Sequence, residues 1–176
     1  MKNDEIEFIK STIEEKMNLK IKGFNKIYQA TVDGGESNVF HKKCDNIKNT
    51  LILYESKGNR RFGGFASENW APIKNEYEQK DDKNCFLFSI DKKIIFKIED
   101  SNYYKIACGL KVGPSFMHNG TYCIQIRNNA FDGGSLRTVE SIHPDIFKGK
   151  QNILSEDGHY HGISCKDYEV HQILFF

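Results

Sequence analysis

Long apolar runs are missing from this 176-residue sequence. A membrane-spanning helix needs about 18 or more consecutive apolar residues, and no segment approaches that length. The N-terminal stretch MKNDEIEFIKST contains acidic side chains and lacks the apolar centre of a secretion signal. The sequence therefore predicts no membrane insertion and a cytoplasmic protein.

Paired cysteine motifs are also missing. The five cysteines are odd in number and widely spaced, and none forms a C-x-x-C pair. Without a secretion signal, this pattern predicts free thiols in a reducing compartment. The five positions are Cys44, Cys85, Cys108, Cys123 and Cys165.

An excess of one charge sign is absent, since 25 Lys and Arg balance 24 Asp and Glu to a net charge of +1. Such a chain has no overall field that would draw it to nucleic acid, so we predict no nucleic-acid partner. The sequence contains no G-x-S-x-G, no P-loop and no G-x-G-x-x-G after a strand. The sequence therefore lacks the most recognisable motifs of hydrolases and of nucleotide-binding proteins.

What is present begins with an amphipathic helix. Ile6, Ile9, Ile13 and Met17 recur at three- and four-residue steps within residues 3–17, which predicts one apolar helix face. The face either packs on the rest of the protein or serves as a docking helix for a partner.

The remainder predicts short strands joined by turns, with few helices. Only three prolines and a 12% share of aromatic residues favour a sheet-dominated, mainly antiparallel fold. Residues 36–44 predict a short helix that Asp33 would cap, and 109–116 predict a loop around Gly113-Pro114. The apolar terminal strand 168–176 should be paired inside a sheet. The other predicted strands are 26–31, 50–56, 60–67, 85–90, 94–98, 103–108 and 121–127.

Two adjacent glycines, Gly63 and Gly64, interrupt the apolar strand RRFGGFAS. Glycine weakens a strand, so its presence indicates a bulge or a place where another group comes close. We expect the pair to leave room for the indole of Trp70 or for a crossing strand.

The same stretch carries a resemblance to a known family. Seven segments, in order, resemble motifs of the TLDc domain, the module of the oxidation-resistance protein family. The match runs from about residue 19 to residue 176, although Met117 and His118 stand after GPSF where the family usually has Gly. The segments are TVDGG (31–35), VFHKKCDN (39–46), TLILYES (50–56), FGGF with the following tryptophan (62–70), CFLFSI (85–90), GPSF (113–116) and YEVHQILFF (168–176).

The resemblance implies a mainly β fold of the α+β class, with two antiparallel sheets packed as a sandwich and a few peripheral helices. It places a TLDc-like domain at 19–176, after the amphipathic helix of 1–18. The positions that match the family's motifs are Asp33, Gly34, Phe40, His41, Phe62, Gly63, Gly64, Phe65, Trp70, Phe86, Phe88, Gly113, Pro114, Phe116 and Glu169.

The resemblance also implies a function. TLDc-like proteins are associated with protection against oxidative stress, and several bind the vacuolar-type proton ATPase and alter its assembly or activity. By this resemblance the chain is a non-catalytic interaction module without a cofactor or metal. Its partner would be that ATPase, which would bring it to the membranes of acidic organelles.

Two groups of residues leave an enzymatic alternative open. His41 and Cys44 lie three apart on one predicted helix and could act as base and nucleophile. His159 and His161, with Asp157 nearby, could bind a metal. The alternatives to an interaction module are therefore a metal- or thiol-dependent antioxidant enzyme and a structural component of a larger assembly.

Overall fold

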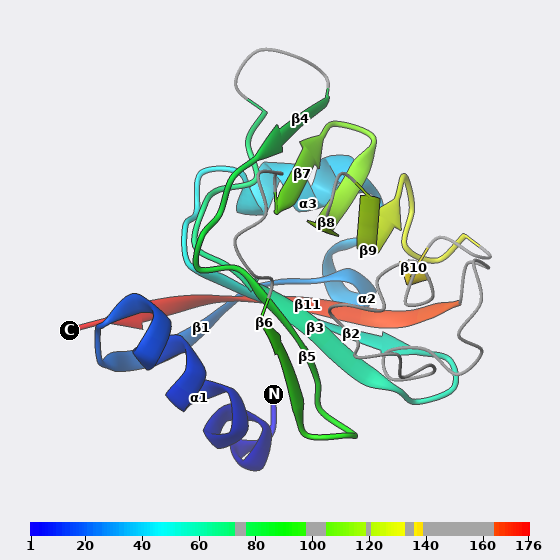
Figure 1. Cartoon of the computed structure of the whole chain (residues 1–176). Coiled ribbons are helices and arrows are strands. Elements are labelled where there is room, and N and C mark those ends of the chain that lie inside the picture. The colour runs from blue at the N-terminus through cyan, green and yellow to red at the C-terminus, as the bar shows by residue number, and fades with distance from the viewer. Residues whose placement is uncertain (73–76, 98–104, 119–120, 133–135, 139–163) are drawn as a thin grey trace.

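The computed structural model describes residues 1–72, 77–97, 105–118, 121–132, 136–138 and 164–176, and these form two antiparallel sheets packed face to face (Figure 1). One sheet has six strands in the order β1-β11-β2-β3-β5-β6, and the other has five in the order β10-β9-β8-β7-β4. This arrangement confirms the predicted sandwich. The strands are β1 Ile21–Gln29, β2 Thr50–Ser56, β3 Arg61–Ala66, β4 Tyr77–Lys80, β5 Phe86–Ser89, β6 Ile94–Lys97, β7 Ile106–Gly109, β8 Val112–His118, β9 Thr121–Arg127, β10 Leu136–Thr138 and β11 Cys165–Phe175.

Both faces of the six-stranded sheet are buried. On β2, Ile52 and Tyr54 belong to the core between the sheets, whereas Leu51 and Leu53 belong to a second core on the outer face. A strand buried on both faces reads as a continuous apolar run, which explains why TLILYES was the clearest strand in the sequence. All of 50–56 is strand, as predicted.

Helix α1 (Asn3–Met17) covers the outer face. Its buried residues Ile9 and Ile13 join the outer core, and Figure 1 shows the helix lying on the side of the sheet away from the five-stranded layer. The predicted apolar face is therefore packed on the sheet, as the first of the two alternatives expected. Among the described helices, none is long and apolar enough to cross a bilayer.

The two glycines of β3 leave room for neighbouring groups on opposite faces of the sheet. A Cβ at Gly64 would lie 2.5 Å from Cζ of Phe116, which comes from the five-stranded sheet. A Cβ at Gly63 would lie 1.9 Å from the carbonyl oxygen of Ile52 and 2.8 Å from Cζ of Phe88. The prediction that the glycines make room was right, but the ring above Gly64 is that of Phe116 rather than Trp70.

The terminal strand β11 lies between β1 and β2, so the apolar 168–176 segment is paired on both sides as expected. The predicted hairpins 50–67 and 85–98 are present as β2–β3 and β5–β6. In β9, however, Cys123 and Gln125 are buried together with Ile124 and Ile126. Both faces of this strand are therefore covered, including the one opposite the isoleucines.

Three predicted boundaries differ from the structure. The strand predicted at 103–108 is β7, which begins at Ile106 and ends at Gly109, and residues 103–104 lie outside the described residues. The strand predicted at 26–31 is β1, which begins at Ile21 and ends at Gln29, where α2 (Ala30–Asp33) begins. The loop predicted at 109–116 is mostly strand β8, and its register is irregular between Val112 and Ser115, where the Gly-Pro pair sits. Proline is tolerated in a strand at such irregularities because no ladder N–H is needed there.

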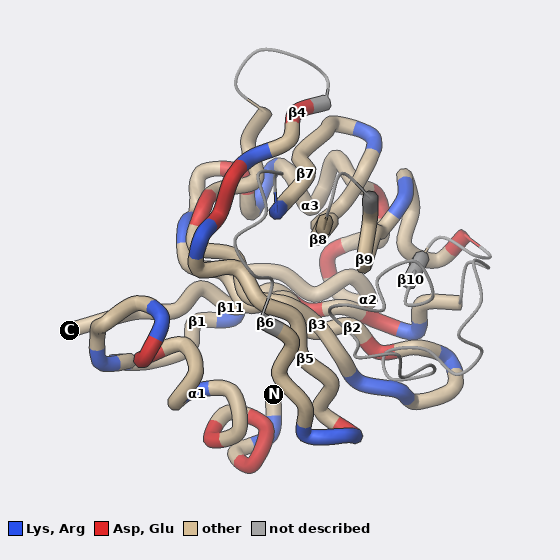
Figure 2. Tube along the Cα trace, in the orientation of Figure 1, with Lys and Arg blue, Asp and Glu red and all other residues tan. Residues whose placement is uncertain are grey.

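Charged residues of both signs are spread along the chain. Figure 2 shows Lys and Arg interspersed with Asp and Glu along the trace in this view, in keeping with the net charge of +1.

Candidate functional site

The residues that match the family motifs mostly build the core. Phe40 of α3 (Ser37–Cys44) and Phe116 of β8 both pack on Trp70, with ring centroids 5.9 and 5.6 Å from the indole and edge-to-face geometry. Phe62 is buried between the sheets, and Phe65, Phe86 and Phe88 are buried in the outer core. These rings therefore hold layers together.

Gly113 and Pro114 lie at the irregular start of β8. A Cβ at Gly113 would lie 3.0 Å from Cγ2 of Ile126, and the carbonyl of Pro114 accepts a 2.9 Å hydrogen bond from the Tyr54 hydroxyl. The motif thus joins the two sheets at a point where a regular ladder is interrupted.

His41 ties α3 to the turn between β7 and β8. Its Nδ1 lies 2.5 Å from Oδ1 of Asp45, and its Nε2 lies 2.7 Å from the carbonyl oxygen of Gly109 and 2.9 Å from that of Val112. Burial lowers the pKa of His41, but the hydrogen bond and charge of Asp45 and the two carbonyls outweigh it and hold that pKa above the ordinary value. With both nitrogens occupied, the ring is not arranged as a base for Cys44.

All five cysteines are buried, and none of them forms a disulfide. Burial raises the pKa of Cys44 and Cys85 well above the usual thiol range, and raises the pKa of Cys108 and Cys165 to about 12. The thiolate is the reactive form, so these four side chains are held in their unreactive state.

Asp33 does not cap α3. Its carboxylate instead accepts hydrogen bonds from the backbone N–H of Gln29 at 2.8 Å and from Nζ of Lys43 at 2.6 Å. The hydrogen bond from Lys43, with a smaller contribution from Gln29, lowers the pKa of Asp33. The following Gly34 has φ of +114°, a conformation that favours glycine. Asp33 therefore closes the short α2 turn rather than starting the next helix.

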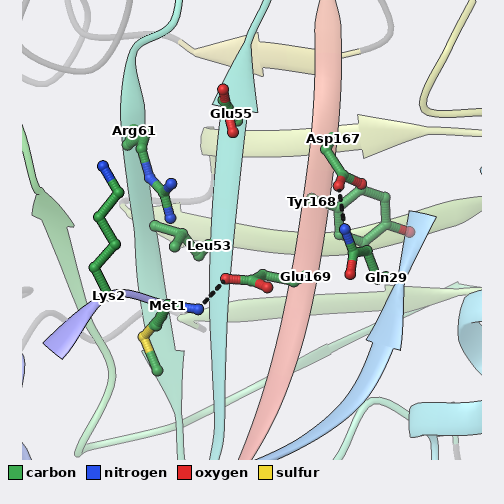
Figure 3. Close-up of a pocket in the computed structure, with 9 residues that line it drawn as sticks. All are labelled: Met1, Lys2, Gln29, Leu53, Glu55, Arg61, Asp167, Tyr168 and Glu169. Atoms are coloured by element: carbon green, nitrogen blue, oxygen red, sulfur yellow. Dashed lines mark hydrogen bonds and ion pairs between the residues drawn. The ribbon is translucent and has the colours of Figure 1, made fainter. Parts of the chain in front are cut away.

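A polar recess of about 260 Å³ opens beside the N-terminal end of α1 on the outer face (Figure 3). In it the amino group of Met1 lies 3.0 Å from Oε1 of Glu169, and Nε2 of His171 lies 3.2 Å from the same oxygen without hydrogen-bond geometry. Burial raises the pKa of Glu169, but His171 and the amino group together lower it to about 2. The motif residue Glu169 is therefore ionised and already paired.

Two further charged groups of the recess, Asp167 and Arg61, are engaged as well. Asp167 accepts hydrogen bonds from Nε2 of Gln29 at 2.7 Å and from the backbone N–H of Thr31 at 3.0 Å, which fastens α2 to β11. Nη2 of Arg61 lies 3.0 Å from Oε2 of Glu5, which fastens α1 to β3. The recess marks the place where both helices are attached to the sheet.

Three exposed apolar side chains lie elsewhere, on α2, on the β7–β8 turn and on the segment after β9. Val32 is 75% exposed, Leu110 50% and Phe131 42%. We call these three residues the end patch. A group of exposed apolar side chains on a soluble domain often marks a binding surface.

Short hydrogen bonds join the β7–β8 turn and the segment after β9 to residues 35–37, which follow α2 in the chain. Oγ of Ser37 donates to the carbonyl of Leu110 at 2.9 Å, and the backbone N–H of Ser37 donates to that of Asn128 at 2.7 Å. The N–H of Ala130 donates to the carbonyl of Gly35 at 2.8 Å, and a Cβ at Gly35 would lie 2.6 Å from the Phe131 ring. Sequence reasoning missed the patch, because the sequence shows apolar residues next to Gly-rich turns but does not show that they are exposed.

A search of the described residues for three or more His, Cys, Asp or Glu side chains placed to hold a metal found no such group. His159, His161 and Asp157 lie outside the described residues, so that predicted metal group stays a prediction.

The chain was compared with known proteins. No curated protein matches it. The family model described as the TLDc domain matches residues 1–174, which includes α1 as well as both sheets. The chain therefore belongs to the TLDc domain family.

Proposed function

We propose that this TLDc domain is a non-catalytic interaction module that docks on the peripheral sector of a vacuolar-type proton ATPase and regulates it. The observation that carries the proposal is the end patch, because Val32, Leu110 and Phe131 expose apolar surface, and hydrogen bonds tie the segments of Leu110 and Phe131 to residues 35–37. Apolar side chains at the centre of an interface supply most of its binding energy.

The positions of the chemically capable residues support a non-catalytic role. The imidazole of His41 and the carboxylate of Glu169 already have structural partners, and the described thiols are buried. By this proposal the protein acts from the cytoplasmic face of acidic organelles. Its association with oxidative-stress protection would then be indirect, through proton pumping.

The end patch is tested by a double variant, Val32→Ser together with Leu110→Ser. These two side chains are the most exposed of the patch, so their loss should leave thermal stability nearly unchanged. Binding of the immobilised domain to purified peripheral sector should weaken by about 10- to 100-fold, which corresponds to roughly 1.4–2.8 kcal/mol. The matched control is Leu19→Ser, because Leu19 is 43% exposed but follows α1.

Equal binding by the double variant and the wild type would remove the end patch as the docking surface. Failure of the wild type to retain ATPase subunits would remove the proposed partner. A separate assay addresses the enzymatic alternative: peroxide consumption by the wild type that disappears in Cys44→Ser would overturn a non-catalytic role.

A further inference from the structure

The partners of His41 determine its protonation. A carboxylate oxygen and two backbone carbonyl oxygens surround the ring, at 2.5, 2.7 and 2.9 Å, and all of them are acceptors. A neutral imidazole carries one N–H and one lone pair, whereas the imidazolium carries two N–H groups. The observed arrangement is complete only when both nitrogens are protonated. The side chain is 6% exposed, so water has little access to replace a lost contact.

Loss of one proton from the ring must therefore break the hydrogen bonding at one of its two nitrogens. A hydrogen bond to an ionised acceptor is stronger than one to a neutral carbonyl. The remaining proton should accordingly stay on Nδ1, facing Asp45. The lone pair of Nε2 would then face the carbonyls of Gly109 and Val112, and this contact would become repulsive. The contact that fails is the one that holds the β7–β8 turn.

The surrounding titratable groups leave Asp45 as the dominant charge on the ring. α3 packs against β1 and β8. Tyr28 of β1, Cys108 of β7 and Cys44 of α3 are buried, and burial raises the pKa of each, so they are neutral where His41 titrates. From β8 and the turn, the ring meets backbone carbonyls.

The turn that His41 holds also carries part of the end patch. Leu110 lies between the two carbonyls that bind Nε2, and its own carbonyl accepts the bond from Ser37 Oγ. We propose that His41 is a pH-sensitive latch that keeps Leu110 in its docking position while the imidazole carries both protons. The regulatory part of this inference rests on the proposed docking function.

The direction of the response follows from linkage. The pKa of His41 is higher in the folded protein than its ordinary value. The latch is therefore fully closed at pH values below that ordinary value, and it opens as the pH rises through the folded value. Docking should weaken with increasing pH.

The test follows the backbone amides of Leu110 and Lys111 and the His41 ring by nuclear magnetic resonance between pH about 5 and about 9, a range that spans histidine titration. We expect the two amides to titrate together with the ring. Their hydrogen exchange should rise several-fold more with pH than in His41→Gln, whose amide can still donate to the turn but does not titrate. His171→Gln is the matched control and should behave as the wild type, since His171 pairs with Glu169 instead.

If His41→Gln does not fold, Asp45→Asn provides the same information. Removing the carboxylate should move the joint transition of ring and turn to lower pH. Turn amides that stay fixed while His41 titrates, or that titrate equally in His41→Gln, would overturn the latch. Because no partner is present in this experiment, a titrating turn in a protein that binds no ATPase would count against the proposed function and not against the latch.

Discussion

Gly63→Ala is expected to destabilise the protein by about 4 kcal/mol or more, above the roughly 1–3 kcal/mol of ordinary overpacking. The added Cβ would lie 1.9 Å from the carbonyl oxygen of Ile52. This oxygen belongs to β2, which is paired with β3 on one side and β11 on the other. The backbone cannot withdraw without disturbing two ladders, whereas a flexible side chain could move aside.

The measurement is the free energy of unfolding in urea, with Gly23→Ala as the matched control. Gly23 lies in β1 of the same sheet, and an added Cβ there would meet no atom within 4 Å. This control should be neutral or stabilising by up to about 1 kcal/mol, because alanine restricts the unfolded chain. Equal stabilities of the two variants would show that the close approach at Gly63 is absorbed by small shifts.

Gly64→Ala should behave differently, because its added Cβ meets the ring of Phe116 at 2.5 Å rather than backbone. Combining it with Phe116→Leu should cost less than the sum of the two single changes, since each relieves the strain of the other. Additive costs would contradict this explanation.

The second large effect is expected at the attachment of α1. Arg61→Met removes the cation that lies 3.0 Å from Oε2 of Glu5 and leaves a carboxylate that is 3% exposed. Removal of one partner from a buried ion pair typically costs about 3–5 kcal/mol. We expect about 3 kcal/mol here, at the lower end of that range, because the Arg61 side chain is 22% exposed.

The double variant Glu5→Gln with Arg61→Met separates this cause from lost packing. With no charge left to bury, it should regain most of the lost stability and lie within about 1 kcal/mol of the wild type. Urea unfolding of the three proteins is the measurement. A double variant as unstable as Arg61→Met would indicate that the arginine stem, and not the charge, holds α1.

The strands could be predicted from the sequence because they are apolar on both faces or separated by recognisable turns. The segments TLILYES and YEVHQILFF contain enough apolar residues to be recognised as strands without knowledge of their tertiary contacts. The order of the strands within each sheet could not be predicted, since nothing in the segment YEVHQILFF indicates that it pairs with β1 and β2. The family resemblance supplied the sandwich that the strand pattern alone left open.

The prediction of individual loops and caps failed where tertiary contacts override the local conformational preference of the residues. Gly113-Pro114 resembles a loop, but the bond from Tyr54 to the Pro114 carbonyl anchors it within β8. Asp33 precedes a helix, as a capping residue would, but its carboxylate accepts hydrogen bonds from Lys43 and Gln29 instead. The partners of His41 include backbone carbonyls 68 and 71 residues away, which no local pattern encodes.

The placement of the cysteines has a practical consequence. All five belong to the core between the two sheets. A thiol-specific reagent should therefore modify mainly those molecules in which the layers have momentarily separated, and its labelling rate would measure how often the native sandwich opens. By the same reasoning, the rate at which a given concentration of oxidant consumes these sulfur atoms is scaled by the fraction of time for which the two sheets are separated.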